Sequence, residues 1–174
     1  MSFRLFFLLI GMVYWMPFSS FDIVRNIGSA KFNLEQDLLL AHYDCKTDVD
    51  DLHSVAAFHS ILMHPDYANL TYHAVAGAYG EQEGLYVPPN KLFQKAFGEN
   101  WSDAHKNREL ALASATLKAR IILEKGGDVW IAEAGQSDFS ADLVKALQKE
   151  LPNIKTKKRI HLVQHSDWNE EAAT

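Results

Sequence analysis

Cysteine is almost absent from this chain of 174 residues, since Cys45 is the only one and no disulfide can form within the chain. Neighbouring carboxylates should raise the pKa of this thiol, so we do not expect Cys45 to act as a nucleophile. Basic residues are outnumbered, because 17 lysines and arginines stand against 22 aspartates and glutamates. The net charge of −5 and the lack of a basic stripe argue against a nucleic acid as partner.

Zinc-binding spacing is absent as well. The chain has eight histidines, but none falls in a His-Glu-x-x-His or comparable pattern. His59 and His64 lie five residues apart, so they would not share one side of a helix. We therefore expect no zinc site. Internal repeats and low-complexity segments are also missing, and the length suits one domain or part of a larger one.

The chain begins with an apolar stretch that is too short to cross a bilayer comfortably. Leu5 to Trp15 follows Arg4 and covers about 11 residues, whereas a membrane helix needs roughly 20. A charged start, an apolar core and the following Pro17 predict a signal peptide over residues 1–20, with residue 30 as a later alternative for its end. The protein would then be secreted or periplasmic, and an uncleaved anchor would be its only membrane attachment.

The most informative stretch joins an apolar run to a crowd of carboxylates. Residues 38–43 are typical of a buried parallel strand, and a helical pattern begins at Leu52. Between them stand four aspartates, Asp44, Asp48, Asp50 and Asp51. Carboxylates this close repel one another, so their grouping predicts either a bound cation or raised pKa values.

Strand-like and helix-like segments alternate along the rest of the chain. We predict strands at about 37–43, 69–76, 128–132 and 159–163, and helices at about 50–63, 104–125 and from 138 onward. Residues 81–103 should form a long irregular segment, either a binding loop or a packed surface excursion. The alternation predicts an α/β fold over residues 37–174, with a mostly parallel Rossmann-like sheet and helices on both faces. Functional groups should gather where the strands end.

The ordered set of segments resembles the inosine–uridine nucleoside hydrolases. In that family a strand runs into Asp-Thr-Asp-Pro-Gly-x-Asp-Asp, which is similar to Asp44 to Asp51 here. Tyr72 to Gly77 resembles the next family strand, which ends in Val-Ala-Gly-Asn, and Ile131 to Asp138 resembles a later strand and its turn. Arg159 to His165 resembles the strand before a Met-Gly-Gly turn. The resemblance spans Asp37 to about Asp167 and implies a nucleoside-hydrolase-like domain that lacks the family's carboxyl-terminal half.

The resemblance implies that Ca²⁺ assists the attack of water on the anomeric carbon of a nucleoside or related riboside. A hard cation prefers several carboxylate oxygens, and it lowers the pKa of bound water. With a two-residue insertion in the acidic motif, Asp44 and Asp51 would bind the metal together with Asp138. Asp44 or Asp48 would be the catalytic base.

The same resemblance assigns substrate contacts to Asp50, Gly77 and His165. Two departures from the family pattern leave an alternative open. Without the insertion, Lys46 falls on the position of the family's second aspartate, and Ala78 replaces the asparagine of Val-Ala-Gly-Asn. The alternative is a catalytically impaired or redirected relative that binds a sugar or a metal.

A second alternative is a phosphatase of the haloacid dehalogenase type. Asp48-Val49-Asp50-Asp51 resembles the Asp-x-Asp motif of that family, although Leu52 stands where a threonine is expected. The base, the sugar and any assembly into oligomers stay open at this point.

Overall fold

A computed structural model describes residues 30–47 and 49–174. The predicted signal peptide and Asp48 lie outside these residues. The described residues form five strands, β1 (Leu38–Tyr43), β2 (Thr71–Ala76), β3 (Trp101–Asp103), β4 (Val129–Ala134) and β5 (Ile160–Gln164). The helices are α1 (Asp50–Leu62), η1 (Pro65–Tyr67), α2 (Asn90–Phe97), α3 (Arg108–Glu124), α4 (Asp138–Glu150), α5 (Thr156–Arg159) and α6 (Trp168–Glu171). None of the helices in the described ranges is long and apolar enough to span a bilayer.

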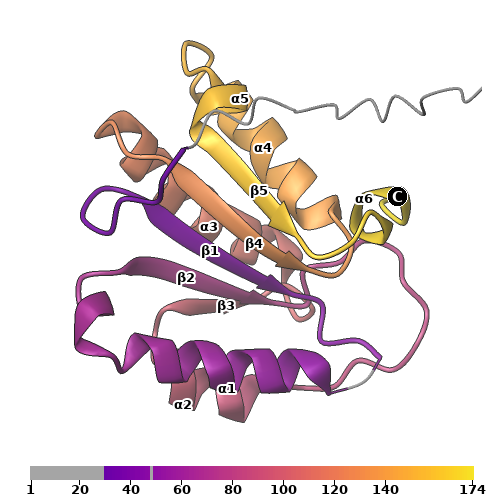
Figure 1. Cartoon of the computed structure of the whole chain (residues 1–174). Coiled ribbons are helices and arrows are strands. Elements are labelled where there is room, and N and C mark those ends of the chain that lie inside the picture. Colours follow the sequence, from indigo (N-terminus) through magenta and orange to yellow (C-terminus); the bar gives the residue numbers. More distant parts are fainter. Residues whose placement is uncertain (1–29, 48) are drawn as a thin grey trace, which may run out of the picture. The chain divides into compact units, whose positions relative to one another are not determined.

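The five strands form one parallel sheet in the order β3-β2-β1-β4-β5 (Figure 1). The chain builds outward from β1 through β2 to β3, and α3 then carries it back across the sheet to β4 on the other side of β1. This arrangement is an α/β Rossmann-like fold, so the predicted fold class is confirmed. The reversal of direction places the topological switch point between β1 and β4, where open α/β sheets bind their ligands.

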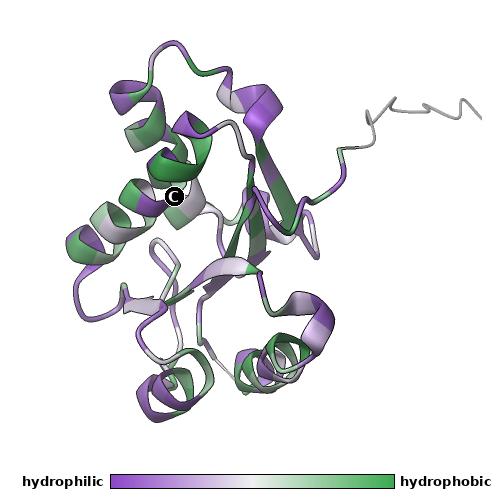
Figure 2. Cartoon of the chain, turned by 90° about the vertical axis from the view of Figure 1, so that its left-hand side faces the viewer, coloured by the Kyte–Doolittle hydropathy of each residue, from purple (hydrophilic) through white to green (hydrophobic). Residues whose placement is uncertain are grey.

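Alternation along β1 explains why both faces of the sheet are covered. Leu38 and Leu40 belong to a core with Val129 of β4 and with the buried sides of α3 and α4. Ala41 and Tyr43 belong to a second core, with α1 and α2. Because successive strand residues point to opposite faces, the apolar run of β1 supplies both cores. The helices therefore lie in two groups with the sheet between them (Figure 2).

The prediction of a long irregular segment over residues 81–103 was wrong. Within it, α2 spans Asn90–Phe97 and β3 spans Trp101–Asp103. Phe93 and Phe97 are buried in the second core, and Trp101 packs against it. Three residues are too few for strand alternation to be visible in a sequence, and α2 covers barely two turns.

Several predicted boundaries also shift. The third helix begins at Arg108, not Ala104, because the side chain of Asn107 accepts a hydrogen bond from the Leu110 main-chain N–H at 3.0 Å and caps the helix. β4 extends to Ala134, two residues beyond the predicted strand. The extension brings the end of β4 level with Tyr43, the last residue of β1.

Candidate functional site

A small cavity of about 180 Å³ lies at the switch point, and we call it the switch-point pocket. Its walls come from the loop after β1, the start of α1, the loop after β2, the turn after β4 and the segment after β5. The residues that matter below are Asp44, Lys46, Asp50, Asp51, Gln82, Gly135, His165 and Trp168. Polar side chains that follow the parallel strands therefore meet in this pocket.

Two carboxylates in this pocket are almost completely buried. Asp44 is 6% exposed and Asp51 is 4% exposed. The main-chain N–H of Asp44 donates to the Ala134 carbonyl at 3.0 Å, which ties the end of β1 to the end of β4. The Asp51 carboxylate accepts the N–H of Cys45 at 2.7 Å, and that of Asp44 accepts the N–H of Lys46 at 2.9 Å. These contacts fix both side chains in one orientation.

The Asp51 carboxyl has a pKa raised to about 8. Burial is the largest cause, and the negative charge of Asp44 and that of Asp50 add to it, while the N–H of Cys45 acts in the opposite direction. Burial and the two neighbouring carboxylates therefore favour the protonated form of Asp51. Burial, Asp51 and Asp44 likewise raise the pKa of Cys45, partly offset by a main-chain hydrogen bond at Gly77; this agrees with the prediction that this thiol is not a nucleophile.

Gly135 permits the close approach of Asp44 to the turn after β4. It adopts a φ of +116°, which side chains disfavour. A Cβ at this position would lie 2.6 Å from the Asp44 Cβ and 2.7 Å from its Oδ2. Any larger residue would push the carboxylate out of its place.

The structure separates the predicted site residues into two groups. Asp44, Asp50, Asp51 and His165 line the switch-point pocket. Gly77 and Asp138 instead line a neighbouring cavity of about 370 Å³, and Asp48 lies outside the described residues.

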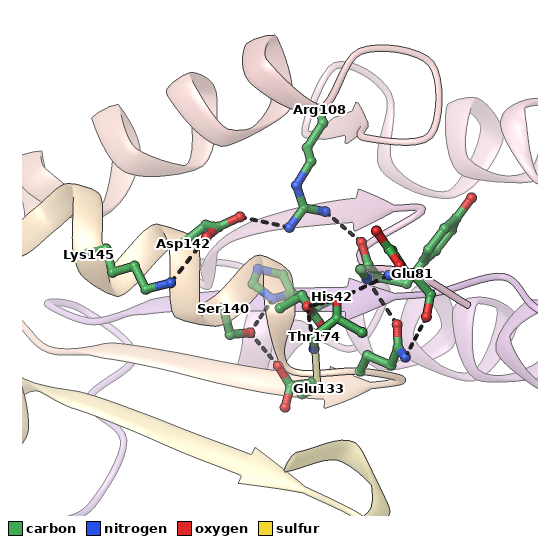
Figure 3. Close-up of polar contacts among 12 residues, drawn as sticks. His42, Glu81, Arg108, Glu133, Ser140, Asp142, Lys145 and Thr174 are labelled. Carbon is green, nitrogen blue, oxygen red and sulfur yellow. Dashed lines mark hydrogen bonds and ion pairs between the residues drawn. The ribbon is translucent and has the colours of Figure 1, made fainter. Parts of the chain in front are cut away.

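Arg108 and Asp142 dominate the polar contacts of the neighbouring cavity. The Arg108 guanidinium donates to Asp142 at 2.9 Å and to the Tyr79 carbonyl at 2.5 Å (Figure 3). Asp138 Oδ1 accepts the N–H and the hydroxyl of Thr174, at 2.8 and 2.6 Å. Close packing requires glycine at position 77, because a Cβ there would lie 2.5 Å from the main-chain N of His105. Sequence analysis did not predict the Arg108–Asp142 pair, which joins residues 34 positions apart.

The donors in the switch-point pocket fit a hard cation by their chemistry, because oxygen dominates. Besides the carboxylates, the amide Oε1 of Gln82 is buried and has no hydrogen-bond partner in the described ranges. Within residues 30–47 and 49–174, no three histidine, cysteine, aspartate or glutamate side chains are grouped as a metal site. Asp44 and Asp51 therefore offer a pair of ligands, and Gln82 is an oxygen donor that the sequence analysis did not single out.

One positive charge also enters this pocket. The Lys46 ammonium donates to the main-chain carbonyl of Gln82 and lies 4.3 Å from the centre of the Tyr79 ring. Tyr79 in turn is hydrogen-bonded to His105 at 2.6 Å. The Lys46 side chain therefore packs against the loop that follows β2, and this loop forms one wall of the pocket.

A buried polar network links β1, β4 and the start of α4. The Ser140 hydroxyl of α4 donates to Glu133 of β4 and is 2.9 Å from Nδ1 of His42 on β1 (Figure 3). The Ser137 hydroxyl donates to the same carboxylate at 2.7 Å. Burial, with a smaller contribution from His73, lowers the pKa of His42 to about 3, so its ring stays neutral. The network therefore joins the two switch-point strands to the first turn of α4, and it is too buried to reach a substrate.

Comparisons with known proteins add little to this geometry. No protein-family model matches the chain, and no curated protein matches it. Solved structures that resemble it include two of a mutant ferredoxin-NADP+ reductase from Plasmodium falciparum, one of them with 2'P-AMP. Their TM-scores are 0.37 and 0.34, at 15% and 18% identity, over 75% of this chain and 53% of theirs. The chain thus spans about half the length of these reductases.

Proposed function

We propose that this protein hydrolyses the N-glycosidic bond of nucleosides or related ribosides in the switch-point pocket, with Ca²⁺ as cofactor. The observation that carries the proposal is the buried pair Asp44 and Asp51, which lies in the crevice where open α/β sheets bind ligands. The reaction itself comes from the family resemblance of the motif, and the pocket supplies a place for it. Export by the amino-terminal apolar segment belongs to the same proposal.

The size of the pocket favours the sugar over the whole nucleoside. Its volume of about 180 Å³ is well below the roughly 300–1,000 Å³ of pockets that enclose drug-sized ligands. The base would then lie at the mouth, where His165 is exposed and Trp168 is 46% exposed. An aromatic side chain at the mouth offers a stacking surface for a planar base.

Asp44 and Asp51 would hold the cation, with the Gln82 amide oxygen as a neutral third donor. Two adjacent carboxylates that repel each other at close range lose that repulsion when a divalent ion replaces the shared proton. When bound, the ion lowers the pKa of water and holds vicinal hydroxyls. Asp138 is not needed for this assignment, because it lines the neighbouring cavity.

The side chains of the pocket would then have separate roles in the reaction. Asp44 accepts the proton of the attacking water, a role for which Asp48 is the alternative. Asp50 accepts hydrogen bonds from the sugar hydroxyls. The surrounding negative charge stabilises the oxocarbenium-like transition state, and His165 donates a proton to the departing base.

An assay of ribose release from a panel of nucleosides tests this function. The wild-type chain should release free ribose, and a calcium chelator should abolish the release. Asp50→Asn should lower the rate, because an amide is a poorer acceptor for the sugar hydroxyls than a carboxylate. Asp66→Asn, at an exposed carboxylate of η1, is the matched control and should change nothing. Absence of ribose release from every nucleoside would refute the proposal.

A sugar- or metal-binding protein without hydrolase activity is the second candidate. Ala78 favours it, because this residue is 1% exposed within the first core and offers no polar contact where the family has asparagine. Lys46 favours it too, because its ammonium lies in the pocket where it reduces the attraction for a cation. Calcium binding without ribose release would select this candidate. No observation favours the phosphatase, since Asp50 and Asp51 stand in the first turn of α1 rather than directly after a strand.

A further inference from the structure

The two edges of the sheet are protected very differently. β3 forms one edge with three residues, and the third is the charged Asp103. β5 forms the other edge with five residues, Ile-His-Leu-Val-Gln, and contains no lysine, acidic residue or proline. In the described part of the chain, β5 forms ladder hydrogen bonds with β4 alone, so its outer edge presents unpaired main-chain groups (Figure 1). Proteins normally blunt such an edge with charges, proline or very short strands.

β5 is also apolar on both of its sides. Leu162 is 47% exposed and Val163 is 56% exposed, and neighbouring strand residues point to opposite faces. Val163 lies at the border of an apolar groove of about 370 Å³ on the α1 side of the sheet, lined also by Trp130 and Phe58. Val163 therefore joins the exposed edge to this groove.

Opposite charges flank this edge strand. Lys157 and Lys158 precede β5, and Asp167 and Glu171 follow it. All four side chains are exposed, and none forms an ion pair with another residue in the described ranges. One end of the strand is thus positive and the other end is negative.

We propose that a second copy of this chain pairs its β5 antiparallel to this β5, so that two sheets join into one across a twofold axis. With Leu162 opposite Leu162 of the second copy, Val163 faces His161 of that copy, and the lysines before β5 come to the same end of the paired strands as the acidic residues that follow β5 of that copy. The positive end of each strand then meets the negative end of its partner, and symmetry repeats each contact. Antiparallel pairing satisfies the unpaired main-chain groups and covers Leu162 and Val163. The strand is complementary to itself, which is why a second copy fits this edge.

Charge reversal of the full chain tests this dimer by sedimentation equilibrium. The wild type should be dimeric, and Lys157→Glu with Lys158→Glu should raise the dissociation constant about tenfold or more, because attractive contacts on both sides of the twofold axis become repulsive. Asp167→Lys with Glu171→Lys should do the same. A mixture of the two variants should form heterodimers, because each then offers the charges that the other lacks. Lys91→Glu with Lys95→Glu, at exposed lysines of α2, is the control and should leave the dimer intact.

A second arm tests the edge without changing the flanking charges. Val163→Lys places a charge on β5 and should yield a monomer, whereas Leu110→Lys, at a 67% exposed position on α3, should not. Circular dichroism should be unchanged in both. A wild-type monomer at all concentrations would overturn the proposal. A dimer that tolerates both charge reversals and Val163→Lys would also overturn it, and would assign the association to another surface.

Discussion

Carboxylates at the two ends of the sheet are in opposite electrostatic situations. At the amino-terminal end, Asp128 accepts hydrogen bonds from Arg159 and from His161, the latter at 2.8 Å. Burial tends to raise its pKa, but these two partners outweigh burial and lower it. At the carboxyl end, Asp51 has Asp44 as its neighbour and its pKa rises. A carboxylate that serves the fold is accompanied by cationic partners, whereas neither Asp44 nor Asp51 forms an ion pair in the described ranges.

Asp44→Asn should have the largest effect, and the effect should be on catalysis. Removing a general base typically lowers the rate about 10² to 10⁴-fold. The same change should leave the free energy of unfolding unchanged or higher at neutral pH, because it removes a source of repulsion at Asp51. Ribose release and urea denaturation measured on one preparation would check both. A large loss of stability would mean that Asp44 stabilises the fold, as Asp128 does, and would contradict its assignment as a catalytic residue.

The pH dependence of stability should separate the two ends next. The folded pKa of Asp51, about 8, lies above its ordinary value of 3.8, so its proton contributes stability that is full below about pH 4 and is lost as the pH rises toward 8. Asp128 has a lowered pKa, so its contribution is present above the ordinary value and is lost as the pH falls below it.

Urea denaturation of the wild type and Asp51→Asn between pH 4 and 8 checks this contrast. We expect the wild type to lose roughly 1–3 kcal/mol more than the variant over this range, since burial holds one proton on the pair. Added Ca²⁺ should restore the loss at pH 8. Parallel curves for the two proteins would mean that Asp51 is ionised throughout.

Asp128→Asn should have the smallest effect, and only on stability. The Arg159 and Asp128 side chains are 28% and 26% exposed, so solvent weakens their ion pair. We expect a loss of about 1 kcal/mol in the free energy of unfolding, with ribose release unchanged. The matched measurement on Asp37→Asn adds a structural carboxylate that accepts the indole N–H of Trp130 at 3.1 Å. An altered rate of ribose release in either variant would contradict the claim that carboxylates at the amino-terminal end of the sheet affect stability alone.

The sequence predicted the fold class better than it predicted the contacts between residues distant in the sequence. The apolar run of β1 and the helical spacing after Leu52 are local patterns, so the α/β fold class could be predicted from them and from the alternation that follows. The three-residue β3 has too little alternation to be recognised. Gln82 and Arg108 owe their positions to loops and to partners distant in the sequence, which periodicity does not report.

The separation of Asp138 from the acidic pair has a similar cause. Both follow strand ends, as predicted, but the helix start at Asp138 turns its side chain toward Thr174 and Gly80. Strand order alone places a residue at the correct edge of the sheet, and the local path of the turn then decides which cavity it lines.

Calorimetric titration of Ca²⁺ into the wild type and Asp51→Asn near pH 7, in two buffers of different ionisation enthalpy, tests the central claim most directly. The account predicts binding to the wild type with release of a proton, because the ion displaces the proton that burial and Asp44 hold on Asp51. Asp51→Asn should bind far more weakly and release none. Equal heats from the two proteins, or no heat from either, would contradict the proposal that these carboxylates form a cation site.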